Sequence, residues 1–418
     1  MIAPAATLRL LDGPPQAAGA ETLAAHLARV GPLPQHPGGS LIDVIDEAGL
    51  RGRGGAGYPS ARKWAAARQR SRGDAVVVAN GAETEPMSAK DRVLMTTRPH
   101  LVLDGVLLAA EAVAAQRAVV YITRAHDDAA AAVSQAIDER RAAGDLPLPV
   151  SLSRAPHRYV AGEESAVIAH LNGGAARPTV VPPRPFERGV DGRPTLVHNV
   201  ETLAHAAVIA RHGADRYRRA GADGATGTVL VTMAGAIHAA GVYELAGGST
   251  VAQAVSAGGG ATASVAAVLV GGYFGCWVAA DDAWDLRLGV DVPLGSGVIA
   301  VFPHGRCGVA QTAALVGFLA RESARQCGPC EHGLAAIAST TAELASGNAK
   351  PRDAERLQRW IGQIAGRGAC HHPDGALVLL ASGLRVFAGD VSTHLRRGRC
   401  DRDRTALLPA PDWIGKRR

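Results

Sequence analysis

Three cysteines have the spacing of a metal or cluster site. Cys327 and Cys330 form a C-x-x-C pair, and Cys370 follows forty residues later. Two thiolates at one turn can converge on a metal ion or cluster, and a distant third thiolate indicates a site that only folding assembles. A thioredoxin-like redox pair and plain buried cysteines are the alternatives, although a redox C-x-x-C should lie near a βαβ pattern. This pair lies among predicted helices.

The other possible ligands give weaker signals. His371 and His372 adjoin Cys370 and could bind a metal, but two adjacent histidines are more often surface residues. The remaining cysteines have no paired spacing and are interpreted as structural; they are Cys276, Cys307 and Cys400. Six cysteines in 418 residues are too few for a disulfide framework, which favours a reducing, cytoplasmic location.

The stretch 50–64, LRGRGGAGYPSARKW, is rich in glycine and basic residues. Its glycines between 52 and 57 allow positive φ and a close approach of the backbone to a ligand. Free N–H groups there, with Arg51, Arg53 and Lys63 nearby, would form a cradle for an anion such as phosphate.

This stretch also contains G-x-G-x-x-G, which alone is weak evidence for a dinucleotide fingerprint. Such a fingerprint follows a β-strand, whereas the preceding run 41–48 has its apolar residues at helical spacing. The standard Rossmann interpretation of the loop is therefore rejected. A mobile glycine-rich surface loop remains the alternative.

Two pairs of carboxylates lie near the ends of predicted strands. They are Glu83 with Glu85 and Glu163 with Glu164. An isolated acidic pair is usually part of a solvated loop, but two pairs facing a glycine cradle indicate a site, since carboxylates accept hydrogen bonds from ribose hydroxyls. Tyr58 and Phe186 could stack on a flat base, with core packing as the alternative.

Short apolar strands alternate with helices in the first half of the chain. Strands are predicted at 74–80, 118–122 and 148–152, and helices at 101–114, 127–143, 165–171 and 197–211. This alternation predicts an α/β fold with a mostly parallel sheet and helices on its faces. In such sheets ligands bind beyond the carboxyl ends of the strands, where the acidic residues lie.

The pattern changes twice further along. Residues 227–303 predict a β-grasp-like module, and helices at 308–321, 331–346, 352–365 and 374–395 predict a four-helix bundle. The expected organisation is an N-terminal extension, three domains and a basic tail that is solvated or docks a partner. The N-terminal extension is expected at 1–40, the α/β domain at 41–226, the β-grasp-like domain at 227–303, the helical bundle at 304–395 and the basic tail at 396–418.

Composition excludes several classes of function. Hydrophobic residues make up 47% of the chain and charged residues 20%, enough for a sizeable core. The net charge of +6 is spread without an aromatic-interleaved basic stripe, so nucleic-acid binding is not expected. No run of about 18 apolar residues predicts a membrane span, and the N-terminus does not resemble a secretory signal.

Taken together, the motifs resemble the NADH-oxidising flavoprotein subunit of bacterial respiratory complex I and the diaphorase subunits of NAD-linked hydrogenases and formate dehydrogenases. The resemblance covers about 40–395 and rests on 50–59, 80–86 with 90–92, 159–164, 194–202, and 322–330 with Cys370. It implies a Rossmann-like FMN and NADH domain, a β-grasp (soluble-ligand-binding) domain, and a helical bundle with a [4Fe–4S] cluster.

The resemblance also implies an activity. Hydride would pass from NADH to FMN, and single electrons would leave through the cluster to other subunits of a complex, in the cytoplasm or peripherally on a membrane complex. The residues implied around FMN are Gly54, Gly55, Gly57, Lys63, Asn80, Gly162, Glu163, His198, Asn199 and Thr202. Those implied around NADH are Tyr58, Glu83, Glu85, Glu164 and Phe186, and those at the cluster are Cys327, Cys330 and Cys370.

Four positions depart from the family pattern. Ala324 replaces the first cluster cysteine, Ala82 an aspartate, His198 an asparagine and Ala66 an aromatic residue. Each replacement around the nucleotide removes a hydrogen bond or a stacking surface worth about 1 kcal/mol, and together they would lower the affinity for NADH by roughly two decades. A divergent paralogue is expected. A non-catalytic assembly or ligand-binding protein, or a flavoprotein with another donor, are the alternatives.

Overall fold

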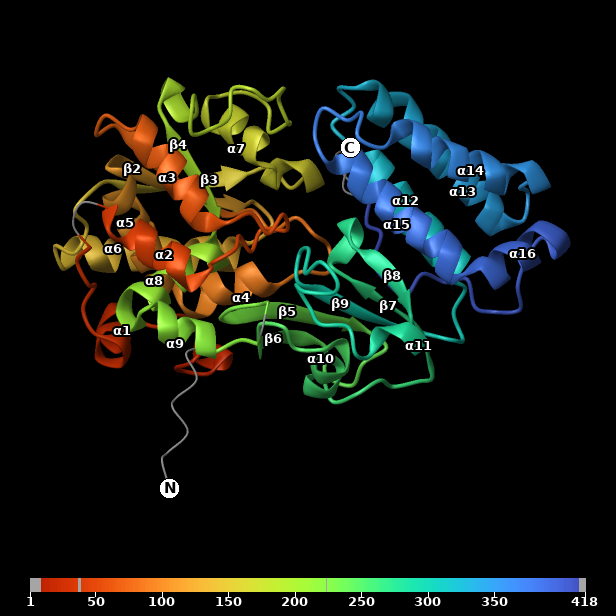
Figure 1. Ribbon diagram of the computed structural model, residues 1–418, viewed down its shortest axis with the longest axis horizontal. Helices are drawn as coiled ribbons and strands as arrows, with labels where there is room; N and C mark the ends of the chain where they lie inside the picture. Colours follow the sequence, from red (N-terminus) through yellow and green to blue (C-terminus); the bar gives the residue numbers. More distant parts are fainter. Residues whose placement is uncertain (1–8, 37–38, 223, 413–418) are drawn as a thin grey trace.

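Two β-sheets and a set of helices follow one another along the chain (Figure 1). The structure is a computed structural model that describes residues 9–36, 39–222 and 224–412. In Figure 1 the first sheet lies at the left, the second at the lower centre, and the C-terminal helices at the upper right.

The first sheet is parallel throughout and has the strand order β3-β2-β1-β4. Its strands are β1 (Ala75–Gly81), β2 (Ala115–Thr123), β3 (Val150–Ala155) and β4 (Thr195–Asn199). The predicted parallel sheet is confirmed. Because all four strands run the same way, their carboxyl ends meet at one edge, where β1 ends at Gly81 and β4 at Asn199.

Helices cover both faces of this sheet. Val77 and Ala79 of β1 pack into one core with helix α5 (Pro99–Val113), whereas Val76 and Val78 pack into a second core with helix α7 (Glu164–Leu171). This period-two alternation is what a strand buried on both faces requires. The helices of this part are α1 (Leu23–Val30), α2 (Leu41–Ala48), α3 (Ser60–Arg70), α4 (Lys90–Thr97), α5 (Pro99–Val113), α6 (Asp127–Ala142), α7 (Glu164–Leu171), α8 (Val200–His212) and α9 (Ala214–Arg219).

The helix predicted from residue 197 begins later than expected. Residues 195–199 form β4, which pairs with β1, and α8 starts at Val200. The Asn199 side chain accepts a hydrogen bond from the Glu201 backbone N–H and so caps the helix. The apolar run before Asn199 is too short for periodicity to distinguish strand from helix.

The glycine-rich loop follows a helix, as predicted. Helix α2 ends at Gly49, which has a left-handed conformation with φ of 68°. The chain then passes through residues 50–59 and enters α3 at Ser60. The rejection of a Rossmann fingerprint at this loop is therefore confirmed.

The second sheet is mixed and has the strand order β6-β5-β9-β7-β8. The sheet occupies the range 227–303, where a β-grasp-like module is predicted. Helix α10 packs on one face, and the C-terminal helices pack on the other. The elements are β5 (Thr228–Gly235), β6 (Gly241–Ala246), α10 (Val251–Ala257), β7 (Val265–Val270), β8 (Cys276–Ala279), α11 (Ala280–Ala283) and β9 (Val298–Pro303).

The C-terminal region is helical, and its last predicted helix is broken. The helices are α12 (Gly308–Glu322), α13 (Ala335–Ser346), α14 (Pro351–Ile364), α15 (His372–Val386) and α16 (Ala388–Arg397). A bend of 77° at Phe387 separates α15 from α16. The Phe387 ring packs edge-on against Trp277 of the second sheet, 5.2 Å between centroids. The periodicity of apolar residues along the sequence cannot predict such a tertiary contact.

Both ends of the described chain pack against the protein. The backbone N–H groups of Leu10 and Leu11 donate to the Glu244 carboxylate. Near the other end, Leu408 is only 1% exposed, and its N–H donates to Gln311 Oε1 over 2.9 Å. Most of residues 401–406 are nevertheless exposed, so the expectation of a solvated or docking tail stays open for them; residues 413–418 lie outside the described part.

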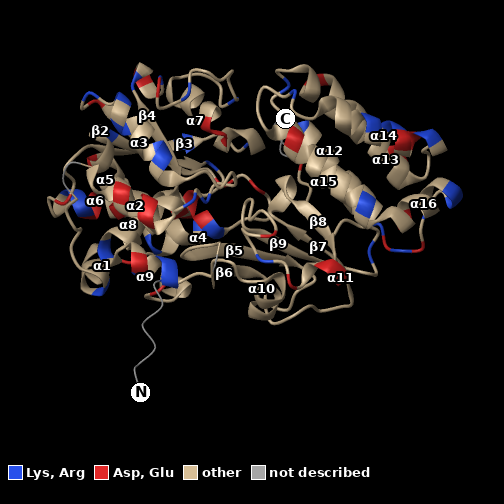
Figure 2. Ribbon diagram, in the orientation of Figure 1, with Lys and Arg blue, Asp and Glu red and all other residues tan. Residues whose placement is uncertain are grey.

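Charged residues of both signs are interleaved on the helices (Figure 2). Within the described ranges, no single helix has both the length and the apolar character to cross a membrane. Two bent helix pairs, 90–97 with 99–113 and 372–386 with 388–397, reach that threshold by length and composition only.

Candidate active site

The glycine-rich loop is closed at its base by backbone hydrogen bonds. The Gly52 N–H donates to the Tyr58 carbonyl and the Ser60 N–H to the Leu50 carbonyl, each over 2.9 Å. Gly55 has φ of 112° and Gly57 has φ of 60°. These values lie in the region that favours glycine, so the residue type is dictated by the turn.

The loop lies over the carboxyl edge of the first sheet. A Cβ added to Gly54 would lie 3.3 Å from Asn199 Cβ, and one added to Gly55 would lie 3.9 Å from the backbone of Gly295, in the second sheet's connecting loops. The Arg53 N–H donates to Thr202 Oγ1 over 2.9 Å. Both sheets therefore contribute walls to the space around this loop.

The basic side chains of the loop do not all face this space. The Arg53 guanidinium donates to the carbonyls of Thr226 and Thr228, at 3.3 and 3.1 Å. These bonds use Arg53 Nη2 to hold the loop beside β5, while Arg53 Nε has no partner among the described residues, so the expectation that Arg53 helps hold an anion stays a prediction. Lys63 Nζ lies 2.9 Å from Glu164 Oε1, so two predicted site residues form an ion pair at the edge of the site.

Two asparagines hold the strand ends together. Asn80 Nδ2 donates to the Gly162 carbonyl over 2.8 Å, and Asn199 Nδ2 donates to Asp91 Oδ2 over 2.7 Å. A Cβ on Gly162 would lie only 2.8 Å from the Ala82 carbonyl oxygen. The turn 159–162 therefore lies directly against the segment that follows β1.

Two of the four predicted carboxylates cap helices. Glu83 accepts hydrogen bonds from the Asp91 and Arg92 N–H groups at the start of α4, and Glu163 accepts from Ser165 N at the start of α7. Both stabilise helix N-termini. Burial nonetheless raises the pKa of Glu83 to about 7, and nearby Asp91 adds to that effect.

Glu85 and His198 each keep one buried polar atom without a hydrogen-bond partner among the described residues, Glu85 Oε1 and His198 Nε2. The other Glu85 oxygen accepts from the Tyr159 hydroxyl over 2.9 Å and from the Tyr273 N–H over 3.0 Å. Burial raises the pKa of Glu85 to about 7 and lowers the pKa of His198 well below its usual value. Buried atoms of this kind fit a polar ligand, because leaving them unsatisfied costs about 1–3 kcal/mol each.

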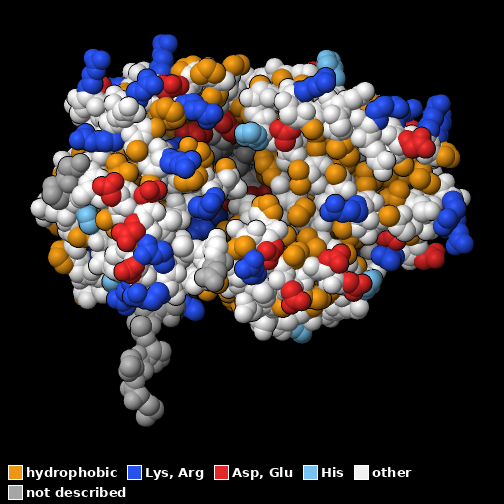
Figure 3. All heavy atoms as spheres, viewed as in Figure 1, with side chains coloured by type: hydrophobic (Ala, Val, Ile, Leu, Met, Phe, Trp, Pro, Cys, Tyr) orange, Lys and Arg blue, Asp and Glu red, His pale blue; other side chains and the backbone are white. Residues whose placement is uncertain are grey.

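The two predicted stacking aromatics have different surroundings. Tyr58 is 55% exposed and free to stack, whereas Phe186 packs against the core of the first sheet. Figure 3 shows a hollow with charged side chains at its rim. It lies between the part that contains the first sheet (the first lobe, 9–219) and the C-terminal helices (the second lobe, 308–397).

Glu85→Gln is expected to flatten the dependence of stability on pH. The folded pKa of about 7 exceeds the ordinary 4.5, so the folded state holds the proton more tightly. Glu85 therefore stabilises the fold below about pH 4.5, and this contribution, about 3 kcal/mol, is lost as pH rises to about 7. Urea titrations from pH 4.5 to 7.5 measure it; an equally steep loss in Glu85→Gln contradicts the assignment.

The three predicted cluster thiols lie near one another. Cys327 and Cys330 share one turn, where the Cys330 N–H donates to the Cys327 carbonyl over 3.0 Å. Burial first, and then Cys327 and Cys370, raise the pKa of the Cys330 thiol to about 12. Burial also raises the pKa of Cys370, and Glu163 contributes to that shift, so the cysteine site adjoins the turn 159–164.

The histidines beside Cys370 are not a surface pair. His371 is fully exposed, but His372 is buried and its Nε2 lies 2.7 Å from the Leu319 carbonyl oxygen. The His372 ring contacts the Tyr159 ring, 5.7 Å between centroids. The expectation of two surface histidines is therefore wrong for His372, which lies between the cysteine site and the first lobe.

One grouping of possible ligands was missed. Among the described residues, Cys307, His394 and Cys400 bring their ligand atoms within 4.8 Å of one another. Their spacing along the chain matches no usual metal motif, so only the packing of α12 against α16 reveals it. Cys307 and Cys400, interpreted from the sequence as structural, thus lie together with a histidine.

Comparison with known families defines the class of protein. Residues 45–208 match the Nuo51 FMN-binding domain, and residues 307–394 match the NADH-ubiquinone oxidoreductase-F iron-sulfur binding region. The chain is thus of the class of flavin-dependent NADH oxidoreductases that combine FMN with an iron–sulfur cluster.

Individual relatives specify the family. The F 2 subunit of NADH-quinone oxidoreductase in Rhizobium meliloti (strain 1021) is 30% identical over 380 residues, which cover 86% of this chain and 90% of the relative. The corresponding F subunit in Escherichia coli (strain K12) is 30% identical over 386 residues, covering 85% and 84%. The chain belongs to the family of NADH-quinone oxidoreductase F subunits, which confirms the predicted resemblance.

A solved structure agrees with this assignment. The chain superposes on a chain of a NAD+-reducing [NiFe]-hydrogenase in the H2-reduced state with a TM-score of 0.79 at 30% identity. The match covers 90% of this chain and 65% of the hydrogenase chain.

Proposed function

We propose that this chain is the NADH-oxidising subunit of a cytoplasmic electron-transfer complex, free or attached to a membrane complex. The observation that carries the proposal is the glycine-rich loop over the carboxyl edge of the first sheet, together with two buried atoms near the sheet, Glu85 Oε1 and His198 Nε2, that have no hydrogen-bond partner among the described residues. When bound, FMN accepts a hydride from NADH and releases electrons singly. The functional units would be 41–226, 227–303 and 304–395.

The residues divide between the two nucleotides. Around FMN we place Gly54, Gly55, Gly57, Lys63, Asn80, Gly162, Glu163, His198, Asn199 and Thr202. Around NADH we place Tyr58, Glu83, Glu85, Glu164 and Phe186. Of the second group, Glu85 offers a free oxygen to a ribose hydroxyl and Tyr58 an exposed ring to a base. The pKa of His198 is lowered, so its ring is neutral, and its Nε2 can make one hydrogen bond to FMN without placing a charge beside it.

The nucleotide site and the cysteine site share a physical link. Glu322, the last residue of α12, accepts hydrogen bonds from Arg158 Nε over 2.9 Å and from the Tyr159 N–H over 3.1 Å. The turn 159–162 is thereby held to the start of the cysteine segment. Cys327, Cys330 and Cys370 would hold the cluster, and buried Ala324 supplies no fourth thiolate.

A hollow beside the cysteines supports the exit of electrons to a partner protein. Its volume is about 420 Å³, and Pro329, His332, Trp360, Ile364 and Arg367 are among its lining residues. It adjoins the turn that carries Cys327 and Cys330, so a protein docked there would lie close to the cluster.

The absorbance spectrum of the purified chain tests the function. We expect flavin bands near about 370 and 450 nm with an iron–sulfur shoulder, all bleached by NADH under anaerobic conditions. A flavin that NADH leaves oxidised would favour another electron donor. A colourless chain that takes up no FMN would favour the non-catalytic alternative.

Cys327→Ser is expected to reduce bound iron to background while FMN content stays unchanged. The proposed cluster site has three thiolates, Cys327, Cys330 and Cys370, so the loss of one leaves too few to hold a cluster. Iron analysis and flavin absorbance measure the two quantities separately. Cys276→Ser, a cysteine change in β8, is the matched control and should retain iron; unchanged iron in Cys327→Ser would place the metal elsewhere.

A further inference from the structure

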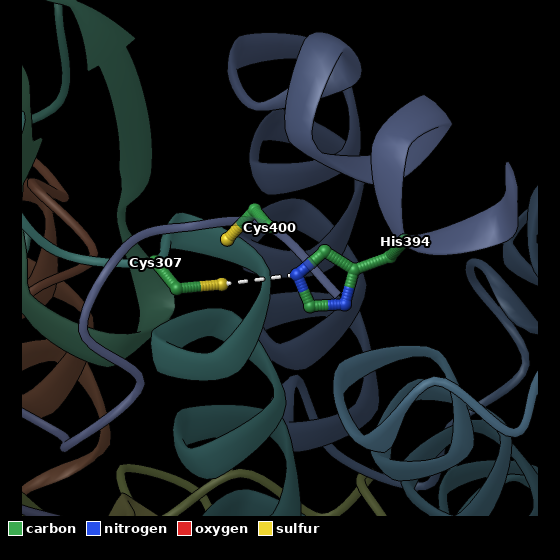
Figure 4. A group of neighbouring side chains, drawn as sticks. All are labelled: Cys307, His394 and Cys400. Atoms are coloured by element: carbon green, nitrogen blue, oxygen red, sulfur yellow. Dashed lines mark hydrogen bonds between the residues drawn. The ribbon is translucent and has the colours of Figure 1, made fainter. Parts of the chain in front are cut away.

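A second group of ligands lies away from the C-x-x-C turn. Cys307 precedes α12, His394 belongs to α16, and Cys400 follows α16 (Figure 4). The Cys307 sulfur and His394 Nε2 point toward each other across 3.4 Å, and the Cys400 sulfur completes a triangle with all three atoms within 4.8 Å. The cysteines are not joined in a disulfide.

These separations match a single metal ion. Tetrahedral zinc has bonds of about 2.3 Å to sulfur and about 2.0–2.1 Å to nitrogen, which separates neighbouring S and N ligands by about 3.6 Å and two sulfurs by about 3.8 Å. A cubane cluster places each thiolate on a different iron and so spreads them further apart. The three residues are therefore too close together for a cluster.

The histidine is already oriented as a ligand. Its Nδ1 lies 3.0 Å from the Leu344 carbonyl oxygen, and a carbonyl can only accept a hydrogen bond, so the proton resides on Nδ1. The lone pair is then on Nε2, the atom that faces the Cys307 sulfur. A carbonyl bound to the second nitrogen is the usual arrangement for metal-bound histidine.

Hydrogen bonds to the backbone position Cys307 directly and the segment after Cys400 through Asp403. The Cys307 sulfur accepts a hydrogen bond from the Ala310 N–H over 3.3 Å. The Cys307 N–H donates to the Asp403 carbonyl over 2.8 Å, and the Asp403 N–H donates to the Gly305 carbonyl over 3.0 Å. These bonds bring the segment that carries Cys400 alongside the start of α12.

We propose that Cys307, His394 and Cys400 bind one zinc ion, separately from the iron–sulfur site, with a water molecule in the fourth position. Binding releases the two thiol protons, so two thiolates balance the two positive charges of the ion and the imidazole stays neutral. The ion fastens residues 398–412 to α12 and α16.

The test uses the full chain with Cys327→Ser and Cys370→Ser, so that zinc cannot occupy the cluster thiols. We expect one zinc per chain by elemental analysis, and the visible d–d bands of a tetrahedral thiolate site after exchange with cobalt(II). Adding Cys307→Ser should lower bound zinc at least about tenfold, a loss of about 1.4 kcal/mol or more in binding. Serine is a good helix N-cap, so this variant keeps the start of α12.

Cys400→Ser provides a second variant at a partly exposed loop position, with the same expected loss. Cys276→Ser in the same background should keep its zinc. Zinc that persists in both Cys307→Ser and Cys400→Ser, a chain that binds no zinc, a Cys307–Cys400 disulfide in the isolated protein, or iron in place of zinc would each overturn the proposal.

Discussion

Lys90→Met is expected to destabilise the protein by about 3–5 kcal/mol, because it leaves two buried carboxylates without their cation. The Lys90 side chain is 4% exposed, and its Nζ lies 2.7 Å from Asp91 Oδ1 and 2.8 Å from Glu201 Oε2. Burial alone would raise the pKa of Glu201, yet Lys90 and His205 hold it at about 2. Because the free energy of unfolding of a native protein is about 5–15 kcal/mol, this loss is a large share of the stability.

Urea denaturation at pH 7 measures the effect. Lys350→Met is the matched control, because Lys350 is exposed and its replacement should change the unfolding free energy by less than about 0.5 kcal/mol. A Lys90→Met loss as small as that of the control would mean that the carboxylates are neutralised in some other way. Asn199 also donates to Asp91, so a folded Lys90→Met chain should bind FMN more weakly as well.

Gly55→Val is expected to remove FMN almost completely, at least about a tenfold fall in bound flavin per chain. Gly55 has φ of 112°, and the space beyond it ends at the Gly295 backbone 3.9 Å from an added Cβ. Two methyl groups placed there would occupy the space in which we place the flavin. The fold itself should survive, because the loop is closed at its base by hydrogen bonds that Gly55 does not make.

Gly73→Val separates blockage from backbone strain. Gly73 has φ of 84° and no atom within 4 Å of an added Cβ, so valine there has comparable strain without filling the site. Flavin content by absorbance after acid release, with circular dichroism as a check on folding, compares the two variants. Equal flavin in both would mean that the ring does not lie over Gly55.

The sequence predicted those features that short-range chemistry determines. The alternation of strands and helices predicted the parallel sheet, and the helical spacing before the glycine loop excluded a Rossmann fingerprint. Tertiary contacts decided the rest. Arg53 donates to the Thr228 carbonyl of β5, Phe387 contacts Trp277 where the last predicted helix bends, and Cys307 meets Cys400 only after the chain has folded.

The roles of the acidic residues show the same limit. Residue type and placement identify Glu83, Glu85, Glu163 and Glu164 as a group. Only the structure separates Glu85, one oxygen of which has no partner among the described residues, from Glu83, which caps a helix. Any of these carboxylates could have filled either role. Which one does so depends on which backbone N–H groups lie within reach after folding.

The Glu322 carboxylate has a consequence for the rate at which electrons cross between the lobes. This carboxylate accepts hydrogen bonds from both Arg158 and Tyr159. Helix α12, which ends at Glu322, and the turn 159–162 are therefore held at a fixed separation. Electron tunnelling slows steeply as the gap between donor and acceptor widens. The two hydrogen bonds of this buried carboxylate therefore help to fix the distance that an electron must cross between the turn 159–162 and the cysteine segment.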